Sequence, residues 1–200
     1  MSFVNFVLPV LKPRRWDFLA FGLLFVAVDG LDRLLHLGLG PALDLDAGSL
    51  QAPWRLLSYA LIQPDPWRAA GAALAVPVGM TMAARTCGPA AAWTGILVGA
   101  VVGALGHLLL TPTPGLLGAS ALLYAALAMG TVAWFRVRDE LSFARRVDWL
   151  AGFGTLGLVL TSLLMPIVGQ EPFHPEYALA FVAGLVVTAA WPRHFESVMR

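Results

Sequence analysis

Ser120 is the residue whose surroundings most clearly suggest chemistry. It follows the Gly-rich stretch 115–119 and opens an apolar run that continues through Tyr124. Because four residues make about one helical turn, we expect Ser120 and Tyr124 on the same helix face. A hydroxyl at a helix N-terminus can act as a nucleophile, since free backbone N–H groups there can hold an oxyanion. A serine in an apolar helix can also bond back to a carbonyl of its own helix, and the residues alone leave both interpretations open.

A serine nucleophile needs a base that removes its proton, and the sequence offers four histidines for that role. His107 ends an apolar segment on the same predicted membrane side as Ser120. His174 is followed by Pro175, which places it in a loop, and it lies seven residues, or about two helical turns, before Phe181. His107 and His174 are therefore the candidate bases, while His36 is more distant and His194 lies on the opposite side.

The same histidines raise the question of a bound metal or pigment. His36, His107 and His174 could meet at the outer membrane face, yet they show none of the short spacings of a metal motif. A histidine ligand to haem or pigment has equally little support in the sequence. We expect no cofactor and no metal, and we interpret these residues as polar groups at helix ends.

The composition is that of a membrane protein. Hydrophobic residues make up 58% of the 200 residues and charged residues 12%, and the mean hydropathy is +0.76. Soluble domains carry about 25% charged residues. We therefore expect a single polytopic membrane domain over residues 1–200, with its core at 16–192 and no nucleic-acid partner. The lone Cys87 excludes an intrachain disulfide.

Apolar segments predict an all-α bundle of six transmembrane helices. They cover about 16–37, 67–84, 90–110, 118–135, 149–168 and 176–191. Gly, Pro and Asp interrupt residues 39–66 too often for a span, but many apolar residues remain there, which predicts an amphipathic loop in the membrane interface. In the third span the glycines recur at every fourth residue, a stripe that lets another helix approach closely. These glycines are Gly95, Gly99 and Gly103.

Charged residues predict the orientation and some local pairing. With the N-terminus inside, ten of the thirteen basic residues fall on the cytoplasmic side, which satisfies the positive-inside rule. The remaining three are Arg33, Arg55 and Arg68. We therefore expect an integral protein of the bacterial inner membrane with both termini cytoplasmic. At the outer end of the first span, Asp29 with Arg33 and Asp32 with His36 are each four residues apart and can form structural pairs.

Two segments resemble the rhomboid family of intramembrane serine proteases. The pattern Gly118-x-Ser120-x-x-x-Tyr124 resembles the family's active-serine segment, and Trp54-Arg55 resembles the Trp-Arg segment of its first loop. The resemblance covers about residues 16–192 and implies a six-span rhomboid fold with Ser120 at the nucleophile position. Gly184 matches a glycine of the family's last span.

The resemblance also implies a catalytic histidine on the last span, in an Ala-His-x-x-Gly segment. The matching segment runs from Ala180 to Gly184 and has Phe181 at the histidine position. Phenylalanine cannot accept a proton. The family's second span also carries a histidine and an asparagine that support the oxyanion, whereas no His or Asn occurs between Gln63 and Gly106.

These departures lead us to expect a rhomboid-like pseudoprotease. It would bind transmembrane segments or a membrane protein complex through its Gly-lined spans and interfacial loop, with membrane lipids around it. An active intramembrane serine endopeptidase that uses Ser120 with His174 or His107 is the alternative. A structural subunit of a larger membrane assembly is a second alternative.

Overall fold

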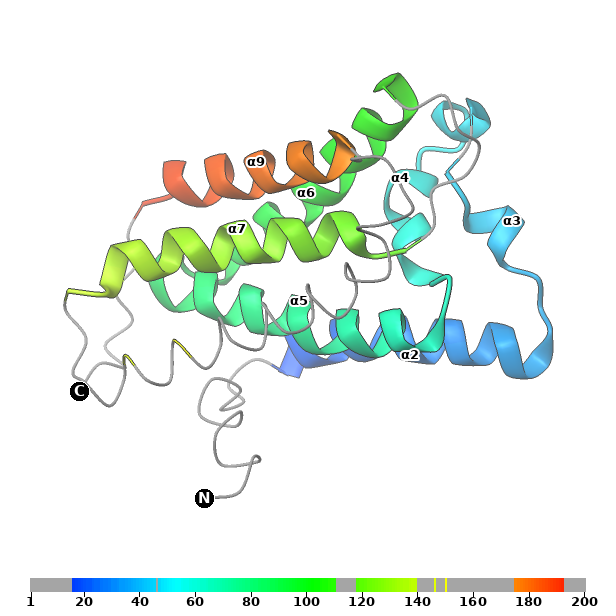
Figure 1. Ribbon diagram of the computed structural model, residues 1–200, viewed down its shortest axis with the longest axis horizontal. Coiled ribbons are helices and arrows are strands. Elements are labelled where there is room, and N and C mark those ends of the chain that lie inside the picture. Colours follow the sequence, from blue (N-terminus) through cyan, green and yellow to red (C-terminus); the bar gives the residue numbers. More distant parts are fainter. Residues whose placement is uncertain are drawn as a thin grey trace, which may run out of the picture.

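The computed structural model describes residues 16–45, 47–110, 118–139 and 175–192, with 146 and 150 as isolated positions. Every regular element in these residues is helical (Figure 1). The long helices are α2 (Trp16–Leu35), α5 (Pro66–Cys87), α6 (Pro89–Leu110), α7 (Ser120–Val137) and α9 (Pro175–Ala190). Between α2 and α5 the chain forms the short elements α3 (Gly40–Leu43), η1 (Ala47–Leu50), α4 (Arg55–Ser58) and η2 (Tyr59–Leu61).

The predicted helices and the predicted loop agree with this arrangement where the structure describes them. Five of the six predicted spans correspond to α2, α5, α6, α7 and α9, and the stretch 39–66 is broken into short turns. The predicted span 149–168 and the N-terminal segment lie outside the described residues. Two described helices, α6 and α7, are long and apolar enough to cross a membrane, and α9 is a shorter apolar helix. The first helix, α2, carries four charged residues: Asp17, Asp29, Asp32 and Arg33.

Local signals explain where α5 begins and ends. Asp65 accepts a hydrogen bond from the backbone N–H of Arg68 (2.9 Å), and Pro66 occupies the first helical position, where no N–H is needed. At the other end Gly88 adopts φ +87°, a left-handed conformation that glycine tolerates, and Pro89 starts α6 immediately afterwards. The short connection makes α5 and α6 antiparallel neighbours.

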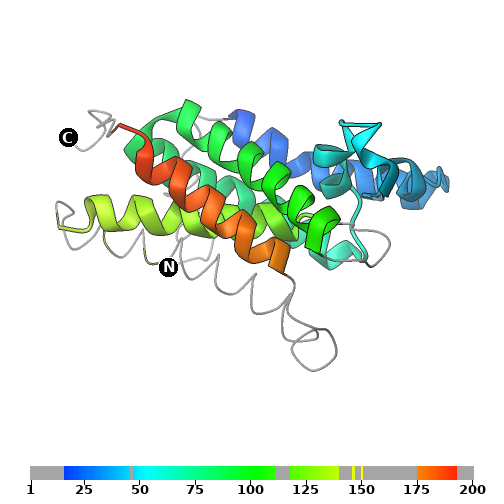
Figure 2. The same cartoon turned by 90° about the horizontal axis from the view of Figure 1, so that it is seen from above.

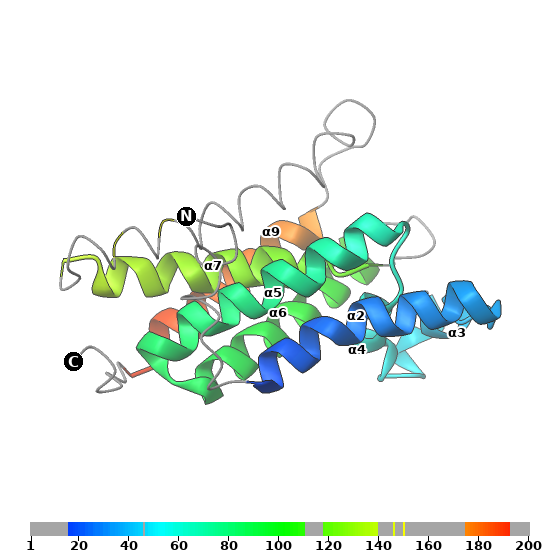
Figure 3. The same ribbon diagram turned by 90° about the horizontal axis from the view of Figure 1, so that it is seen from below.

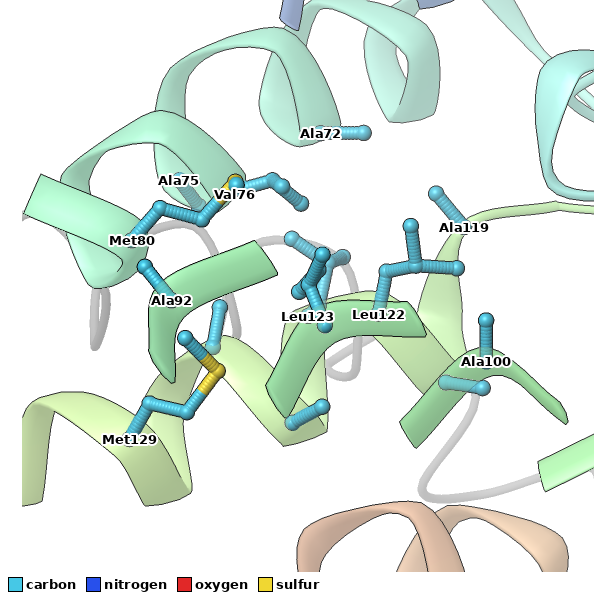
Figure 4. Close-up of a cluster of buried hydrophobic side chains, with 14 of the residues drawn as sticks. Ala72, Ala75, Val76, Met80, Ala92, Ala100, Ala119, Leu122, Leu123 and Met129 are labelled. Carbon is cyan, nitrogen blue, oxygen red and sulfur yellow. The ribbon is translucent and has the colours of Figure 1, made fainter. Parts of the chain in front are cut away.

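The helices form a bundle in which α9 packs against α6 and α7, while α5 packs against α7, α2 and α6. Figure 2 shows α9 and α6 side by side, and Figure 3 shows α2 running along α5 at the edge of the bundle. The buried core between α5, α6 and α7 contains Val76, Met80, Leu122 and Met129, together with many alanines (Figure 4). Small side chains dominate, so the helix backbones lie close together.

The predicted glycine stripe of α6 is the surface on which α7 and α9 pack. A Cβ on Gly99 would lie 2.4 Å from the Cβ of Ala125, and a Cβ on Gly103 would lie 2.7 Å from that of Ala121. Such distances are below any real Cβ contact, so these positions require glycine. The stripe does admit another helix, as predicted. The helices that pack against it, α7 and α9, belong to the same chain, and binding of a partner along the Gly-lined spans stays a prediction.

Polar contacts between helices stabilise the end of the bundle where α5 and α7 end. There Arg136 of α7 donates to the sulfur of Cys87 in α5 (2.8 Å) and to the carbonyl of Ala189 in α9 (2.6 Å). At that same end the Trp93 indole donates to Asp17 (3.1 Å), which joins α6 to α2. The opposite end holds the short helices of the first loop and the N-terminus of α7.

Close helix approach predicts opposite effects for two Gly→Ala substitutions. In Gly184→Ala the new Cβ would lie 2.8 Å from the backbone oxygen of Ala125, so we expect a loss of about 1–3 kcal/mol in unfolding free energy. Gly30 in α2 has no atom within 4 Å of an added Cβ. Gly30→Ala should therefore be neutral or stabilise by about 0.5–1 kcal/mol through reduced backbone entropy.

Unfolding titrations with sodium dodecyl sulfate in mixed micelles measure both variants against the parent protein. Equal stability losses at the two positions would contradict the packing described for α7 and α9.

Candidate functional site

The turn that precedes α7 places Ser120 at the first position of the helix. Gly118 has φ +107° and its N–H donates to the backbone oxygen of Tyr59 (3.0 Å). A Cβ at this position would meet the Oε1 atom of Gln63 at 3.0 Å. Gly118 is therefore required both by its left-handed conformation and by the closeness of the first loop.

Gln63 is the residue that occupies the space beside this turn. Its Oε1 accepts the backbone N–H of Ala119 (3.1 Å), and its Nε2 donates to the carbonyl of Ala60 (2.6 Å). The residue is only 3% exposed. Both ends of the amide have a partner, so the orientation of the side chain is defined by its hydrogen bonds. In the sequence, Gln63 stood out only as the start of the stretch up to Gly106 that contains no His or Asn. The sequence did not predict this contact.

An ion pair in α2 holds the backbone of Gln63. Asp29 accepts from Arg33 Nε (2.8 Å) and from the backbone N–H of Gln63 (3.0 Å), while Arg33 donates to the backbone oxygen of Gln63 (2.7 Å). The predicted structural pair Asp29–Arg33 is thus present. Asp32 instead accepts the N–H of Leu39 (2.8 Å), and its predicted pair with His36 is replaced by this turn contact.

Ser120 and Tyr124 share one face of α7, and this face is turned toward α9. The ring of Tyr124 stacks on that of Tyr177 in α9, with 5.3 Å between centroids and 10° between planes. Ser120 is half-buried, and its hydroxyl makes no hydrogen bond to any residue that the structure describes. Ser120 is the first residue of α7, so α7 itself has no earlier carbonyl to accept a bond back from this hydroxyl.

The face of α9 beside this serine carries aromatic side chains. Tyr177 and Phe181 are four residues apart, so both lie on one face of the helix, and Phe181 is half-buried. Gly184, next along α9, lets α9 approach Ala125 of α7 closely. Sequence reasoning pointed to Phe181, but the ring that contacts Tyr124 belongs to Tyr177. Neither side chain accepts a proton at neutral pH.

His107 makes a buried pair that the sequence did not predict. Its Nδ1 lies 3.3 Å from Oε1 of Glu176 in α9, and the two residues are 3% and 0% exposed. The Nε2 atom of His107 is buried and has no hydrogen-bond partner among the residues that the structure describes. Because the two partners are 69 residues apart in the chain, no short sequence pattern indicates this pair.

The packing register places this pair near the start of α7. Gly95, Gly99 and Gly103 of α6 face Met129, Ala125 and Ala121 of α7, respectively. His107 follows Gly103 by one turn of α6, so it lies at the end of the bundle that holds the N-terminus of α7.

The remaining predicted residues have structural contacts or fall outside the described part. Trp54, 60% exposed, precedes the short helix α4, and Arg55 donates to the carbonyl of Pro41 (3.4 Å). His36 is exposed at the end of α2, and His174 lies outside the described residues. Within the described part of the chain, no group of three His, Cys, Asp or Glu residues could hold a metal ion.

Tyr59 fixes the first loop to the bundle below the serine turn. Its hydroxyl donates to the carbonyl of Ala100 in α6 (3.1 Å), while its own carbonyl accepts the N–H of Gly118. Burial raises the pKa of the Tyr59 hydroxyl, with a smaller contribution from the nearby Tyr177 and Glu176. Tyr59 therefore remains a neutral donor that joins the loop to α6.

Comparison with known proteins agrees with this geometry. The family model described as the Rhomboid domain matches residues 50–194, well over half of the chain. No curated protein and no solved structure matches the chain. The matched region contains the serine turn, Gln63, the His107–Glu176 pair and the glycine contacts of α6 and α9. The chain therefore belongs to the rhomboid family and is an integral membrane protein with a rhomboid domain.

Proposed function

We propose that this protein is a rhomboid pseudoprotease, which binds transmembrane segments of other membrane proteins and does not cleave them. The main support for this proposal is the identity of the side chains on the face of α9 that is turned toward α7. α9 presents Tyr177 and Phe181 there, and the ring of Tyr177 fills the space against Tyr124. A serine hydroxyl without a base is a poor nucleophile.

The surface of α2 is the binding face that we propose for a transmembrane partner. α2 packs mainly against α5, and its buried face consists of Phe18, Gly22, Phe25 and Asp29. The opposite face exposes apolar side chains over much of the helix, namely Leu23, Leu24, Val26 and Leu31. An apolar helix face at the edge of a bundle can pack against either lipid chains or a partner helix.

We also propose six membrane spans with both termini in the cytoplasm of a bacterial cell. Arg85 and Arg136 lie at the bundle end where Arg136 contacts Cys87 and Ala189. Among the described residues, the opposite end, with Ser120 and the first loop, holds Arg33, Arg55 and Arg68, of which Arg33 and Arg68 are paired with Asp29 and Asp65. This distribution supports placing the Arg136 end inside, following the positive-inside rule.

An active intramembrane serine endopeptidase is the second candidate, and the His107–Glu176 pair favours it. A carboxylate on Nδ1 orients a histidine so that Nε2 can act as the base, which is the arrangement of a catalytic triad. Among the described residues Nε2 has no hydrogen-bond partner, and the pair lies at the same end of the bundle as Ser120. The two candidate functions differ in whether the His107 side chain can hydrogen-bond to the Ser120 hydroxyl.

Fluorophosphonate labelling distinguishes the two functions. If the protein is a pseudoprotease, the purified protein should label no faster than its Ser120→Ala variant, because no base activates the hydroxyl. The sample must be folded and monodisperse. Labelling that Ser120→Ala abolishes would contradict the pseudoprotease proposal.

The second candidate makes a separate prediction about His107. If the pair activates Ser120, His107→Ala and Glu176→Gln should each lower the labelling rate by about 100-fold or more, as expected for a general base and its orienting group. His36→Ala, at an exposed position outside the pair, is the matched control and should leave the rate unchanged. Unchanged labelling in the His107 variant would exclude this base.

Cysteine accessibility tests the proposed orientation in a Cys87→Ala background. Leu50 is 66% exposed in the first loop, and Asp139 is exposed beyond the end of α7. We expect a membrane-impermeant maleimide to label Leu50→Cys in intact spheroplasts and Asp139→Cys only after permeabilisation. Labelling of both from the same side would overturn the proposed topology.

Partner binding is tested by photocrosslinking from α2. A benzophenone amino acid at Leu24, on the exposed face, should form a discrete adduct with a second membrane protein in native membranes. The same amino acid at Leu109, 79% exposed at the end of α6, is the control for random collisions. Equal adduct patterns from both positions would contradict a specific α2 face.

A further inference from the structure

The Gln63 side chain presents a carbonyl oxygen to the N-terminus of α7. The first N–H groups of a helix have no partner within it and carry a positive partial charge, so they attract oxygen atoms with negative charge. Gln63 Oε1 accepts the N–H of Ala119, the residue directly before Ser120, at 3.1 Å. A substrate oxyanion beside Ser120 would have to approach the same positive region.

The orientation of this amide is determined by its two partners. Gln63 Nε2 donates to the carbonyl of Ala60 at 2.6 Å. Rotating the amide by 180° would place its NH₂ against the Ala119 N–H and its oxygen against the Ala60 carbonyl, and both contacts would be repulsive. The side chain therefore presents its acceptor oxygen, and not its NH₂ group, to the serine turn.

The surrounding residues hold Gln63 in this place. Its backbone N–H and oxygen bind Asp29 and Arg33, and the residue is 3% exposed. Gly118, which has no side chain, leaves the room that Oε1 occupies. Moving the side-chain amide away from the turn would break its contacts to Ala60 in the first loop and to Ala119 before α7.

We propose that the Gln63 amide oxygen is an internal occupant of the position where the serine turn would hold an oxyanion, and that it keeps Ser120 unreactive. This inference rests on the proposed pseudoprotease function and adds to it. The chemistry is blocked by two separate features, the aromatic side chains on α9 and the carbonyl oxygen from the first loop. The block is electrostatic, because the occupying oxygen repels a second negative oxygen at the same place.

A thiol at position 120 tests the electrostatic block without needing a base. In Ser120→Cys, made in a Cys87→Ala background, the reacting species is the thiolate, whose formation is favoured by positive potential at a helix N-terminus. The alkylation rate with iodoacetamide is measured from about pH 6 to about pH 10, a range that brackets the pKa of a free thiol. This rate reports the electrostatic potential at the turn. We compare three residues at position 63: Gln, Ala and Met.

We expect Gln63→Ala and Gln63→Met each to raise the alkylation rate at pH 7.5 by about fivefold or more and to move the pH profile to lower pH, a direction set by the pH dependence of thiolate formation. Met keeps a side chain of similar length but lacks the amide oxygen. Acceleration by Ala alone would show that side-chain volume, and not the oxygen, limits the reaction, which would overturn the proposal. Equal rates in all three proteins would overturn it as well.

Two controls keep the outcome interpretable. The unfolding midpoint of each variant confirms a folded bundle, and Gln63→Met serves if Gln63→Ala does not fold. Fluorophosphonate labelling of the protein with serine at position 120 tests the proposed function separately, so the thiol rates can overturn the Gln63 proposal while the pseudoprotease proposal stands.

Discussion

Close approach of the α6, α7 and α9 backbones is the constraint on which the rest of the bundle depends. Glycine in α6 faces alanine in α7 at successive turns, and Gly184 of α9 lies against the backbone of Ala125. In a membrane, moving apolar side chains from lipid into a protein interior releases little free energy. Association of the helices therefore depends on tight van der Waals contact between them. A single added methyl group at these positions would separate the helices that carry Ser120, His107 and Tyr177.

Polar groups inside this bundle are arranged so that nearly all have a defined partner. Asp29, Arg33 and Gln63 form one network from α2 to the serine turn, and Tyr59 joins the first loop to both α6 and Gly118. Buried polar groups without partners are costly, which explains why these contacts are numerous. Among the described residues the buried Nε2 of His107 is an exception, and this unsatisfied atom, at the bundle end that carries Ser120, is the observation behind the second candidate function.

Fold and activity are carried by different residues in this protein. The glycines, the serine turn and the Trp54-Arg55 segment position the helices, and a family model for the rhomboid domain matches them. Chemistry would need a base and an oxyanion site; in the pseudoprotease that we propose, Phe181 stands at the base position implied by the resemblance and Gln63 Oε1 lies against the serine turn. A scaffold can lose its reaction while keeping its packing, because the two depend on separate side chains.

The sequence alone determined the helices, the interrupted first loop, the close-packing stripe of α6 and the shared face of Ser120 and Tyr124. Each depends on residues within a few positions of one another, whose periodicity and turn chemistry are local. The tertiary structure alone decided which residues meet across helices: Gln63 with Ala119, His107 with Glu176, and Tyr177 with Tyr124. The first two pairs are 56 and 69 residues apart, and their contacts follow from the register in which whole helices pack. That register is set by the sum of many small contacts, so no short segment of the sequence encodes it.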